Sequence, residues 1–443
     1  MRVGVPRLIW RQGCPMVAAS GRGAMAGRFL DIAIAGAGPA GLAAALYLKR
    51  AGHRVTIFER FDEPAPVGSG LILQPTGLTV LDDLGLLAEI RALGSRIDRL
   101  YGADAASGRT VLDVRYNVGK GGRFGLAVHR AALFGVLFAA AEAAAIAIET
   151  RVDVATVDAG GQTASLVTAD GRRLGGFDLV VDATGARSRL KRLASNPSEP
   201  KPLAYGAFWA SLGWRGDGFD AHALLQRYHK ASVMIGVLPI GRPHAGAEQM
   251  AAFFWSLKPD EADAVRAAGL TAWKDSVAAL WPECAAYLAQ VDSFDQLALA
   301  HYGHHTLAHP IGRSLAIIGD AAHSTSPQLG QGANMALLDA RALAHALAVE
   351  PTVEAALQAY AKMRRMHVRV FQALSFTFTP FYQSDSAVLP FIRDRLVPTI
   401  ALIPPGPQFL ASMVAGTVVD PFEPIGLKEV AWSSMQAAFR HSA

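Results

Sequence analysis

The chain has 443 residues, of which 51% are hydrophobic and 18% are charged, and its formal net charge at pH 7 is +5. This length predicts two or more interleaved domains, because a single hydrophobic core rarely grows to that size. Lysines and arginines form no dense stripe interleaved with aromatic residues, which argues against a nucleic-acid-binding protein. The composition suits a large buried core.

The first 28 residues carry five arginines and no acidic residue, and no continuous apolar segment follows them as in a secretion signal. We expect residues 1–28 to be a disordered extension, with Met25 as a candidate natural start, so that a chain beginning at Met25 folds normally. Cys14 and Cys284 are too far apart in sequence for a metal-type pair, which favours free thiols and a cytoplasmic location.

Two long apolar stretches are too interrupted to cross a membrane. Residues 131–148 contain Glu142, and residues 389–414 contain Arg393 and several prolines. We expect both to pack against the protein body rather than insert stably into a membrane, and peripheral contact of 389–414 with a membrane surface stays open.

The first folded unit is an apolar strand in residues 29–38, a glycine-rich turn GAGPAG in 36–41, a helix in 42–52 and a second apolar strand in 54–60. In G-x-G-x-x-G, the first glycine allows a tight turn, the second lets the backbone approach a pyrophosphate, and the third allows close packing of helix on strand. Glu59 ends the second strand, where a carboxylate can bind ribose hydroxyls and repel a 2′-phosphate. The unit therefore predicts a site for FAD or NAD.

Strands and helices then alternate along the chain. Alternating apolar residues predict a hairpin-like segment in 152–181 and three strands in 203–257, which suggests an open sheet. Residues 259–290 are predicted to be helical, residues 314–320 form an apolar strand, and the chain is mostly helical from Ala333 to Phe376.

A second motif, AIIGDAAHSTSPQLGQGANMALLDA, spans residues 316–340. Asp320 ends its strand, where it can bind the hydroxyls of a sugar-like chain. The backbone N–H groups of Gly332, Ala333 and Asn334 begin a helix and can stabilise negative charge on a ligand. From these residues alone, a ligand site and an ordinary strand–loop–helix connection both stay open.

The pairing of GAGPAG…FER with the 316–340 motif closely resembles the FAD-dependent aromatic-ring hydroxylase superfamily, of the para-hydroxybenzoate hydroxylase type, over roughly residues 29–375. The resemblance implies an α/β fold in which a Rossmann-type FAD-binding domain is interleaved with a mixed β-sheet substrate domain, followed by a helical C-terminal part. The implied FAD-binding domain comprises residues 29–103, 123–195 and 298–350. The substrate domain comprises 104–122 and 196–297, and the C-terminal region 351–443.

The resemblance also implies a set of FAD-binding residues, which are Gly36, Gly38, Pro39, Ala40, Gly41, Glu59, Arg60, Arg130, Val154, Asp320, Gly330, Gly332, Ala333 and Asn334. Arg130 belongs to the family-like segment HRAAL, and the backbone of Val154 would contact adenine. Asp320 would hold the ribityl and pyrophosphate groups, and Pro327 would pack near the reactive edge of the flavin, so these two are the candidate catalytic residues.

Four residues are candidates for the substrate pocket. Leu73 and Gln74 lie in GSGLILQPTG, which resembles the family's loop along the flavin, and Tyr205 and Trp209 share one face of a predicted strand. One position departs from the family, because Thr184 stands where an aspartate usually precedes Gly185 in a motif associated with FAD and NAD(P)H. The histidines in 301–309 lack carboxylate or cysteine companions at metal-ligand spacing, so no metal is expected.

The implied activity is that of a single-component monooxygenase. NADH or NADPH would reduce FAD, O₂ would form a flavin C4a-hydroperoxide, and one oxygen atom would pass to an electron-rich aromatic small molecule. No second glycine-rich motif offers a separate nucleotide domain, so NAD(P)H would bind transiently, to a monomer or homodimer. Three alternatives stay open: another flavin oxidoreductase (reductase, epoxidase or halogenase), a non-enzymatic flavin-binding protein, and an NAD-dependent dehydrogenase.

Overall fold

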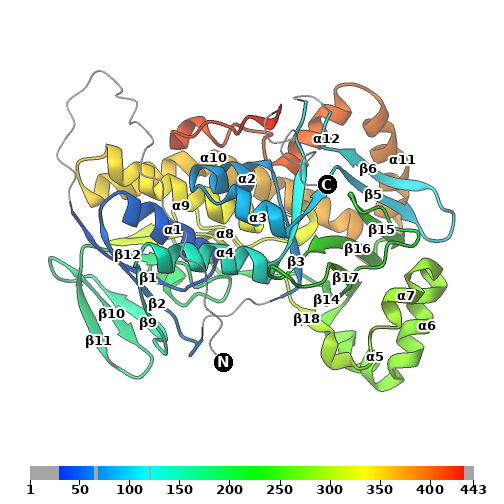
Figure 1. The fold of residues 1–443 in the computed structure, drawn as a ribbon, viewed down its shortest axis with the longest axis horizontal. Helices are drawn as coiled ribbons and strands as arrows, with labels where there is room; N and C mark the ends of the chain where they lie inside the picture. The colour runs from blue at the N-terminus through cyan, green and yellow to red at the C-terminus, as the bar shows by residue number, and fades with distance from the viewer. Residues whose placement is uncertain (1–28, 64–67, 119–120, 434–443) are drawn as a thin grey trace.

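The computed structural model describes residues 29–63, 68–118 and 121–433, in which two large sheets lie side by side with helices around them (Figure 1). The predicted extension 1–28, with Met25 and Cys14, lies outside the described residues. Cys284 is a free, buried cysteine, and burial raises the pKa of its thiol.

The first sheet has six strands in the order β20-β21-β12-β1-β2-β8, and all of its pairs are parallel except β20 with β21. Its strands are β1 Asp31–Ala35, β2 Arg54–Phe58, β8 Ala147–Glu149, β12 Leu179–Asp182, β20 Ile311–Gly312 and β21 Leu315–Ile317. The central strands are apolar because both faces are covered, as in other parallel sheets. This arrangement confirms the predicted Rossmann-type unit.

Helix α1 (Pro39–Arg50) connects β1 to β2 and begins at Pro39, three residues before the predicted start. The fixed φ of proline suits the first turn of a helix, where no N–H partner is needed. Helix α9 (Gly332–Val349) packs on α1, and α10 (Val353–Tyr382) packs on α9. These helices bury one apolar core with β1, β2 and β12, and the predicted helical segment from Ala333 to Phe376 is confirmed as α9 and most of α10.

The second sheet has seven strands in the order β18-β14-β17-β16-β15-β5-β6 and is antiparallel except between β15 and β5. Its strands are β5 Arg99–Asp104, β6 Thr110–Arg115, β14 Gly206–Gly213, β15 Ala223–His229, β16 Val233–Gly241, β17 Met250–Leu257 and β18 Ala298–Ala300. The three strands predicted in 203–257 are β14, β16 and β17, and tertiary pairing adds the other four.

Smaller elements complete the fold. The remaining strands are β3 Gly70–Leu73, β4 Ser95–Ile97, β7 Gly125–His129, β9 Val154–Asp158, β10 Ala164–Thr168, β11 Arg173–Phe177, β13 Lys201–Pro202 and β19 Gly303–His304. The remaining helices are α2 Pro75–Asp83, α3 Leu87–Leu93, α4 Arg130–Ala143, α5 Ala262–Ala268, α6 Leu270–Leu280, α7 Ala285–Leu288, α8 Asp320–His323, α11 Val388–Leu402 and α12 Gly406–Ala415.

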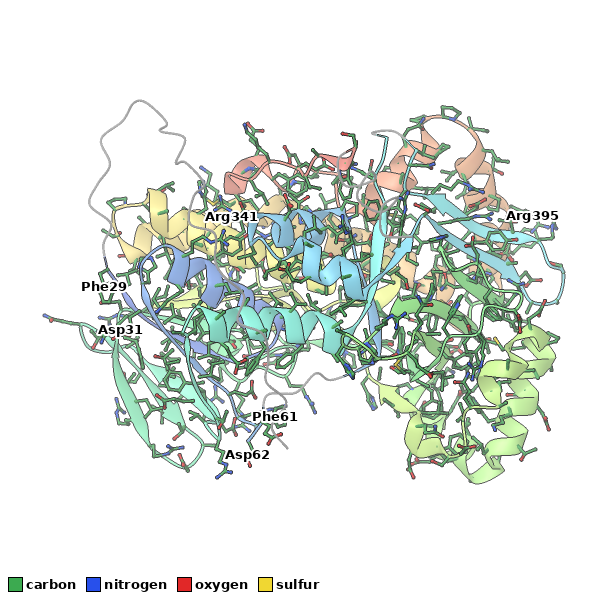
Figure 2. The ribbon with its side chains drawn as sticks, in the orientation of Figure 1. Phe29, Asp31, Phe61, Asp62, Arg341 and Arg395 are labelled. Carbon is green, nitrogen blue, oxygen red and sulfur yellow. The ribbon has the colours of Figure 1, made fainter. Side chains whose placement is uncertain are left out.

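The apolar stretch 389–414 forms α11 and α12, which pack on β6 beside the seven-stranded sheet. Val397 is buried on the inner face of α11, whereas Phe391 and Leu396 are exposed on its outer face. Arg395 stands over the ring of Phe391, at the end of the molecule farthest from Asp31 and Phe29 (Figure 2). Among the described residues, no helix combines the length and apolarity that a membrane span requires.

Strand pairing adjusts two of the expected domain boundaries. Residues 99–103 belong to β5 and residues 298–300 to β18, and both strands pair within the seven-stranded sheet. We therefore propose that these residues belong to the substrate domain, whereas the sequence analysis placed them in the FAD-binding domain. The periodicity of a short strand does not say which sheet it joins.

Candidate active site

A cavity of about 990 Å³ opens where the two large sheets meet. One wall is formed by the carboxyl ends of β1 and β2, the start of α1, and the segment from Asp320 to Ala333. The opposite wall is formed by β5, β6 and β14–β17 together with α10–α12. Parallel α/β sheets bind ligands beyond the carboxyl ends of their strands, so this cavity is the candidate active site.

The glycines of GAGPAG differ in what surrounds them. Gly36 has φ +103°, and a Cβ there would lie 2.6 Å from the carbonyl oxygen of Ala183. A Cβ on Gly41 would lie 2.0 Å from the carbonyl oxygen of Gly36, so this glycine allows close packing of the helix on the turn. Gly41 does not border the cavity. Gly38 lines the cavity, and a Cβ there would meet no atom within 4 Å. The open space at Gly38 and the start of α1 fits the close approach of a pyrophosphate.

Glu59 lies beside this turn and is 8% exposed. Its Oε2 accepts a hydrogen bond from the backbone N–H of Ala37 at 2.8 Å, and its Oε1 accepts one from Phe61 at 3.1 Å. The carboxylate borders the cavity with lone pairs left for ribose hydroxyls. Its bond to the glycine-rich turn is a second role that the sequence motif did not predict.

Three further predicted FAD contacts border the cavity. Arg130 begins α4 next to Gly68, Val154 begins β9, and Arg60 follows Glu59 with its guanidinium 4.5 Å from the ring centroid of Phe61. Their positions extend the wall from the glycine-rich turn toward β9. The space along that wall suits the adenosine half of a dinucleotide.

The second motif approaches the same cavity from β21. Gly319 has φ +62° and turns the chain into α8, which places Asp320 at the cavity wall. A Cβ on Gly332 would lie 3.5 Å from Oδ1 of Asp320, so the carboxylate and the start of α9 are neighbours. Pro327, Gly330, Gly332 and Ala333 also border the cavity. An exposed carboxylate can accept hydrogen bonds from the hydroxyls of a ribityl chain, and the N–H groups of a helix N-terminus can donate to the polar edge of a flavin.

Asn334 acts through its side chain rather than at the cavity wall. Its Oδ1 accepts a hydrogen bond from the backbone N–H of Gln74 at 2.8 Å, and its Nδ2 donates to the carbonyls of Ile72 and Gly330. The side chain is fully buried. Asn334 therefore joins the connection between β3 and α2 to the loop before α9, two cavity-lining segments far apart in sequence.

A buried charged network supports the Gly319–Asp320 turn and was not predicted. Asp339, on α9, accepts hydrogen bonds from the backbone N–H of Gly319 at 2.9 Å, from Nε2 of His323 at 2.5 Å and from Nε of Arg364 at 2.7 Å. Burial by itself would raise the pKa of Asp339, but His323 and Arg364 lower this pKa to about 2. The one sequence feature that pointed to this network is Asp339 itself, an acidic residue in the otherwise mostly apolar segment NMALLDA.

Arg364 is held in turn by His367, whose Nδ1 lies 3.3 Å from the guanidinium, while its Nε2 donates to the carbonyl of Gly416 at 2.9 Å. Burial and the charge of Arg364 lower the pKa of His367 to about 3. A neutral His367 is therefore the acceptor that Arg364 needs, and the network links α9, α10 and the end of α12.

Thr184, the residue that departs from the family pattern, bonds a buried acid at the end of β12. Oδ1 of Asp182 accepts from the backbone N–H and the hydroxyl of Thr184, and Oδ2 accepts from the hydroxyl of Ser188 at 2.5 Å. Burial raises the pKa of Asp182 despite these bonds. Thr184 thereby fixes the turn at Gly185, which lines the cavity.

Of the four residues expected to line the substrate pocket, two lie elsewhere. Leu73 is fully buried in the core of the first sheet and does not border the cavity, whereas its neighbours Leu71 and Ile72 do. Tyr205 precedes β14, and its hydroxyl donates to Asp385 at 2.7 Å outside the cavity. We therefore remove both from the pocket.

Gln74 and Trp209 do border the cavity. Oε1 of Gln74 accepts from the hydroxyl of Tyr116 at 2.6 Å, and Nε1 of Trp209 donates to the hydroxyl of Tyr302 at 2.6 Å. Burial raises the pKa of Tyr302 to about 12, so its hydroxyl stays protonated. Both side chains are held in place by these bonds at the junction of the two sheets.

Comparisons with known proteins agree with this geometry. The family described as "FAD binding domain" matches residues 30–374. A 3-amino-4-hydroxybenzoate 2-monooxygenase of Streptomyces cremeus is 30% identical over 365 residues, which cover 77% of this chain and 84% of that protein. An aurachin C monooxygenase/isomerase of Stigmatella aurantiaca is 27% identical over 388 residues, covering 83% and 94% of the two chains.

The fold is also similar to solved structures. The tetrameric form of 2-methyl-3-hydroxypyridine-5-carboxylic acid oxygenase superimposes with a TM-score of 0.74 at 21% identity, covering 92% of this chain and 100% of that one. Klebsiella pneumoniae HpxO, complexed with FAD and uric acid, gives a TM-score of 0.72 at 18% identity, with coverage of 87% and 97%. On the strength of the family match, this chain belongs to the FAD-dependent aromatic-ring hydroxylase superfamily, a family of FAD-dependent monooxygenases.

Proposed function

We propose that this chain hydroxylates an aromatic small molecule with O₂, using bound FAD and either NADH or NADPH as transient reductant. The observation that carries the proposal is the shared cavity, in which the dinucleotide-type wall of the first sheet faces the apolar wall of the second. Glu59 would hold the adenosine end of FAD, and Asp320 and Gly332 would hold the ring end, so the ring would reach the space between the two walls. The relatives act on benzoates and on aurachin C, so the aromatic class is broad.

When bound, FAD supplies the hydride acceptance and the oxygen activation that no amino-acid side chain provides. The protein's own residues bind and orient it. The N–H groups at the start of α9 would stabilise negative charge on the ring's polar edge, and Asp320 would accept hydrogen bonds from the adjoining hydroxyls. Pro327 limits the space beside the ring. The apolar wall excludes water from the reacting atoms, which limits unproductive loss of the activated oxygen.

The reductant would reach this site along a basic edge of the cavity. Arg60, Arg187 and Arg189 line that edge and are exposed, and Arg189 also pairs with Asp153 at 3.2 Å. Guanidinium groups suit the pyrophosphate of NAD(P)H. We also propose a cytoplasmic location and a monomeric or homodimeric state, which cell fractionation and light scattering of the holoprotein would test.

The decisive experiment is a screen of phenols and heteroaromatic compounds for stimulated NAD(P)H oxidation, with product masses. We expect a substrate that accelerates the oxidation and yields a product heavier by one oxygen atom. Reduction or epoxidation products would point to another oxidoreductase on the same scaffold. A protein that binds FAD but oxidises no NAD(P)H with any compound would overturn the proposed hydroxylation.

A further inference from the structure

The cavity divides into two halves of different chemistry. Its charged lining residues lie away from the seven-stranded sheet, as Glu59 after β2, Asp320 at the start of α8 and Arg130 at the start of α4 illustrate. His301, which directly follows β18, also borders the cavity. The half between the second sheet and α10–α12 has no charged lining residue among the described residues. That uncharged half is called the distal compartment below.

The distal compartment is lined mainly by aliphatic and aromatic side chains from elements far apart in sequence. Leu224 and Met234 come from β15 and β16, Phe378 from α10, Val397 from α11, and Leu410 and Met413 from α12. Because three helices and a sheet close around it, it can bury a long apolar group away from water. Such burial contributes roughly in proportion to the apolar area covered.

Arg393, a cation that contacts two aromatic rings of this compartment, does not line it. Arg393 is fully buried on α11 behind the rings of Tyr228 and Tyr382, at 5.0 and 5.3 Å from their centroids. Its Nε donates to Asp394 at 2.7 Å and its Nη1 donates to the carbonyl of Phe381. Asp394 balances the charge of Arg393, which does not line the cavity; its Nη2 has no hydrogen-bond partner among the described residues.

The polar groups of the compartment are uncharged. The hydroxyl of Tyr228 donates to Oε1 of Gln226 at 3.0 Å, and Nε2 of Gln226 donates to the sulfur of Met234 at 3.3 Å. Gln383, directly after α10, is 6% exposed, and neither its Nε2 nor its Oε1 has a hydrogen-bond partner among the residues that the structure describes. A buried amide with two unused groups lowers stability unless a ligand satisfies it.

From this distribution we infer that the substrate is an uncharged, largely apolar aromatic compound, whose polar group hydrogen-bonds to the amide of Gln383. The inference rests on the proposed function, since it names the class of substrate for the same site. A carboxylate in the distal compartment would lose its hydration without gaining a cation, so the compartment discriminates against anionic substrates. A carboxamide is a matching partner because it can accept from Nε2 and donate to Oε1.

The test uses the FAD-loaded protein and three probes that share a phenol ring: 4-hydroxybenzoate, its butyl ester and N-butyl-4-hydroxybenzamide. Binding is measured by titration of the flavin absorption spectrum without NAD(P)H, so no turnover is needed. We expect both neutral probes to bind at least about tenfold more tightly than 4-hydroxybenzoate, with the amide the tightest. Equal or tighter binding of 4-hydroxybenzoate would overturn the inference, and so would the absence of binding by both neutral probes.

Two variants test Gln383 itself. Gln383→Leu replaces the amide with an apolar group of similar size. It should weaken binding of the amide probe by about tenfold and change binding of the ester probe by less than about threefold. Gln408→Leu makes the same chemical change on the exposed face of α12 and should alter neither affinity. Retained FAD in each variant shows that the fold is intact. An unchanged amide affinity in Gln383→Leu would remove Gln383 from the site.

The binding experiment tests the inferred substrate class, and the reaction experiment tests the proposed hydroxylation, so either can fail without the other. If the neutral probes bind as expected but no aromatic compound gains oxygen in the presence of NAD(P)H, the proposed hydroxylation is wrong and the assignment of the compartment stands. If an anionic benzoate is hydroxylated and binds more tightly than its neutral derivatives, the proposed function stands and the present inference is wrong.

Discussion

The backbone N–H of Ala37 donates to Oε2 of Glu59 across 2.8 Å, so the carboxylate at the end of β2 fixes the glycine-rich turn after β1. The same carboxylate borders the space for the ribose. One side chain therefore orients the turn that receives the pyrophosphate and offers acceptors to the neighbouring sugar. Removal of this side chain should affect both halves of the adenosine diphosphate site.

Glu59→Ala should weaken FAD binding without unfolding the chain. A lost charge-assisted hydrogen bond costs about 1.5–3 kcal/mol, which corresponds to about a tenfold to hundredfold rise in the Kd of FAD. The Kd is measured by quenching of flavin fluorescence. Asp62→Ala is the matched control, because Asp62 is an exposed carboxylate three residues further along that pairs with Arg151. Equal FAD affinity in the two variants would contradict the role of Glu59.

Gly36→Ala and Gly38→Ala should separate stability from FAD binding. At Gly36 a side chain would meet the Ala183 carbonyl at φ +103°, so Gly36→Ala should lower the free energy of unfolding by about 1–3 kcal/mol. At Gly38, with φ −72°, the methyl group would point into open space. The Gly38→Ala apoprotein should therefore have the same unfolding temperature as the parent apoprotein. Its affinity for FAD should be about tenfold lower or weaker still.

Thermal unfolding of the two apoproteins and FAD titration of the holoproteins check this pair. The prediction fails if Gly38→Ala binds FAD with the parent's affinity, because a ligand that approaches the backbone at Gly38 leaves no room for a methyl group.

Asp320→Ala should lose activity and weaken FAD binding together. Its carboxylate lies at the cavity wall beside Gly332, where it would hold the ribityl chain. A small displacement of the ring reduces turnover strongly, because the reacting atoms need near-contact geometry. Asp320→Asn keeps the size and one acceptor, so it should retain more flavin than Asp320→Ala. Retained FAD is measured by absorbance after gel filtration, and turnover by substrate-stimulated NAD(P)H oxidation. Parent-like values in Asp320→Ala would exclude this position from the site.

Asp339→Asn should destabilise the protein by an amount that depends on pH. Breaking a buried ion pair on one side costs about 3–5 kcal/mol at pH 7. The pKa of Asp339 is lowered in the folded protein, to about 2, from about 3.9 in an unfolded chain. Its stabilising contribution is therefore complete above about pH 4 and is lost as the pH falls through about 2.

Urea unfolding of parent and Asp339→Asn at pH 7, 4 and 3 measures this difference, which should be constant from pH 7 to 4 and smaller at pH 3. Asp62→Asn is the control, since an exposed ion pair contributes little. A difference between parent and Asp339→Asn that does not vary with pH would show that packing, rather than charge, makes Asp339 important.

The sequence by itself determined the parts of this protein that depend on local geometry. The spacing in GAGPAG, an apolar strand before it and Glu59 after it predict a dinucleotide site, because each glycine serves the turn within a few residues of itself. The 316–340 motif likewise predicted a strand and a helix from Gly332, and the structure contains them as β21 and α9. The strand was predicted to end at Asp320, but it ends at Ile317, and Asp320 begins the short helix α8 where a loop was expected.

Only the tertiary structure decided which residues from distant segments of the chain lie together at the wall of the cavity. Tyr205 shares the predicted strand face of Trp209, but it precedes β14 and its hydroxyl bonds Asp385, so of the two only Trp209 borders the cavity. Leu73 lies in the loop-like motif beside residues that border the cavity, but it is buried in the core of the first sheet and its helices. Asp339, Arg364 and His367 acquire their roles through contacts between α9, α10 and Gly416. The uncharged character of the distal compartment depends on β15, β16 and α10–α12 meeting in space, because no local pattern in the sequence records which side chains surround a cavity.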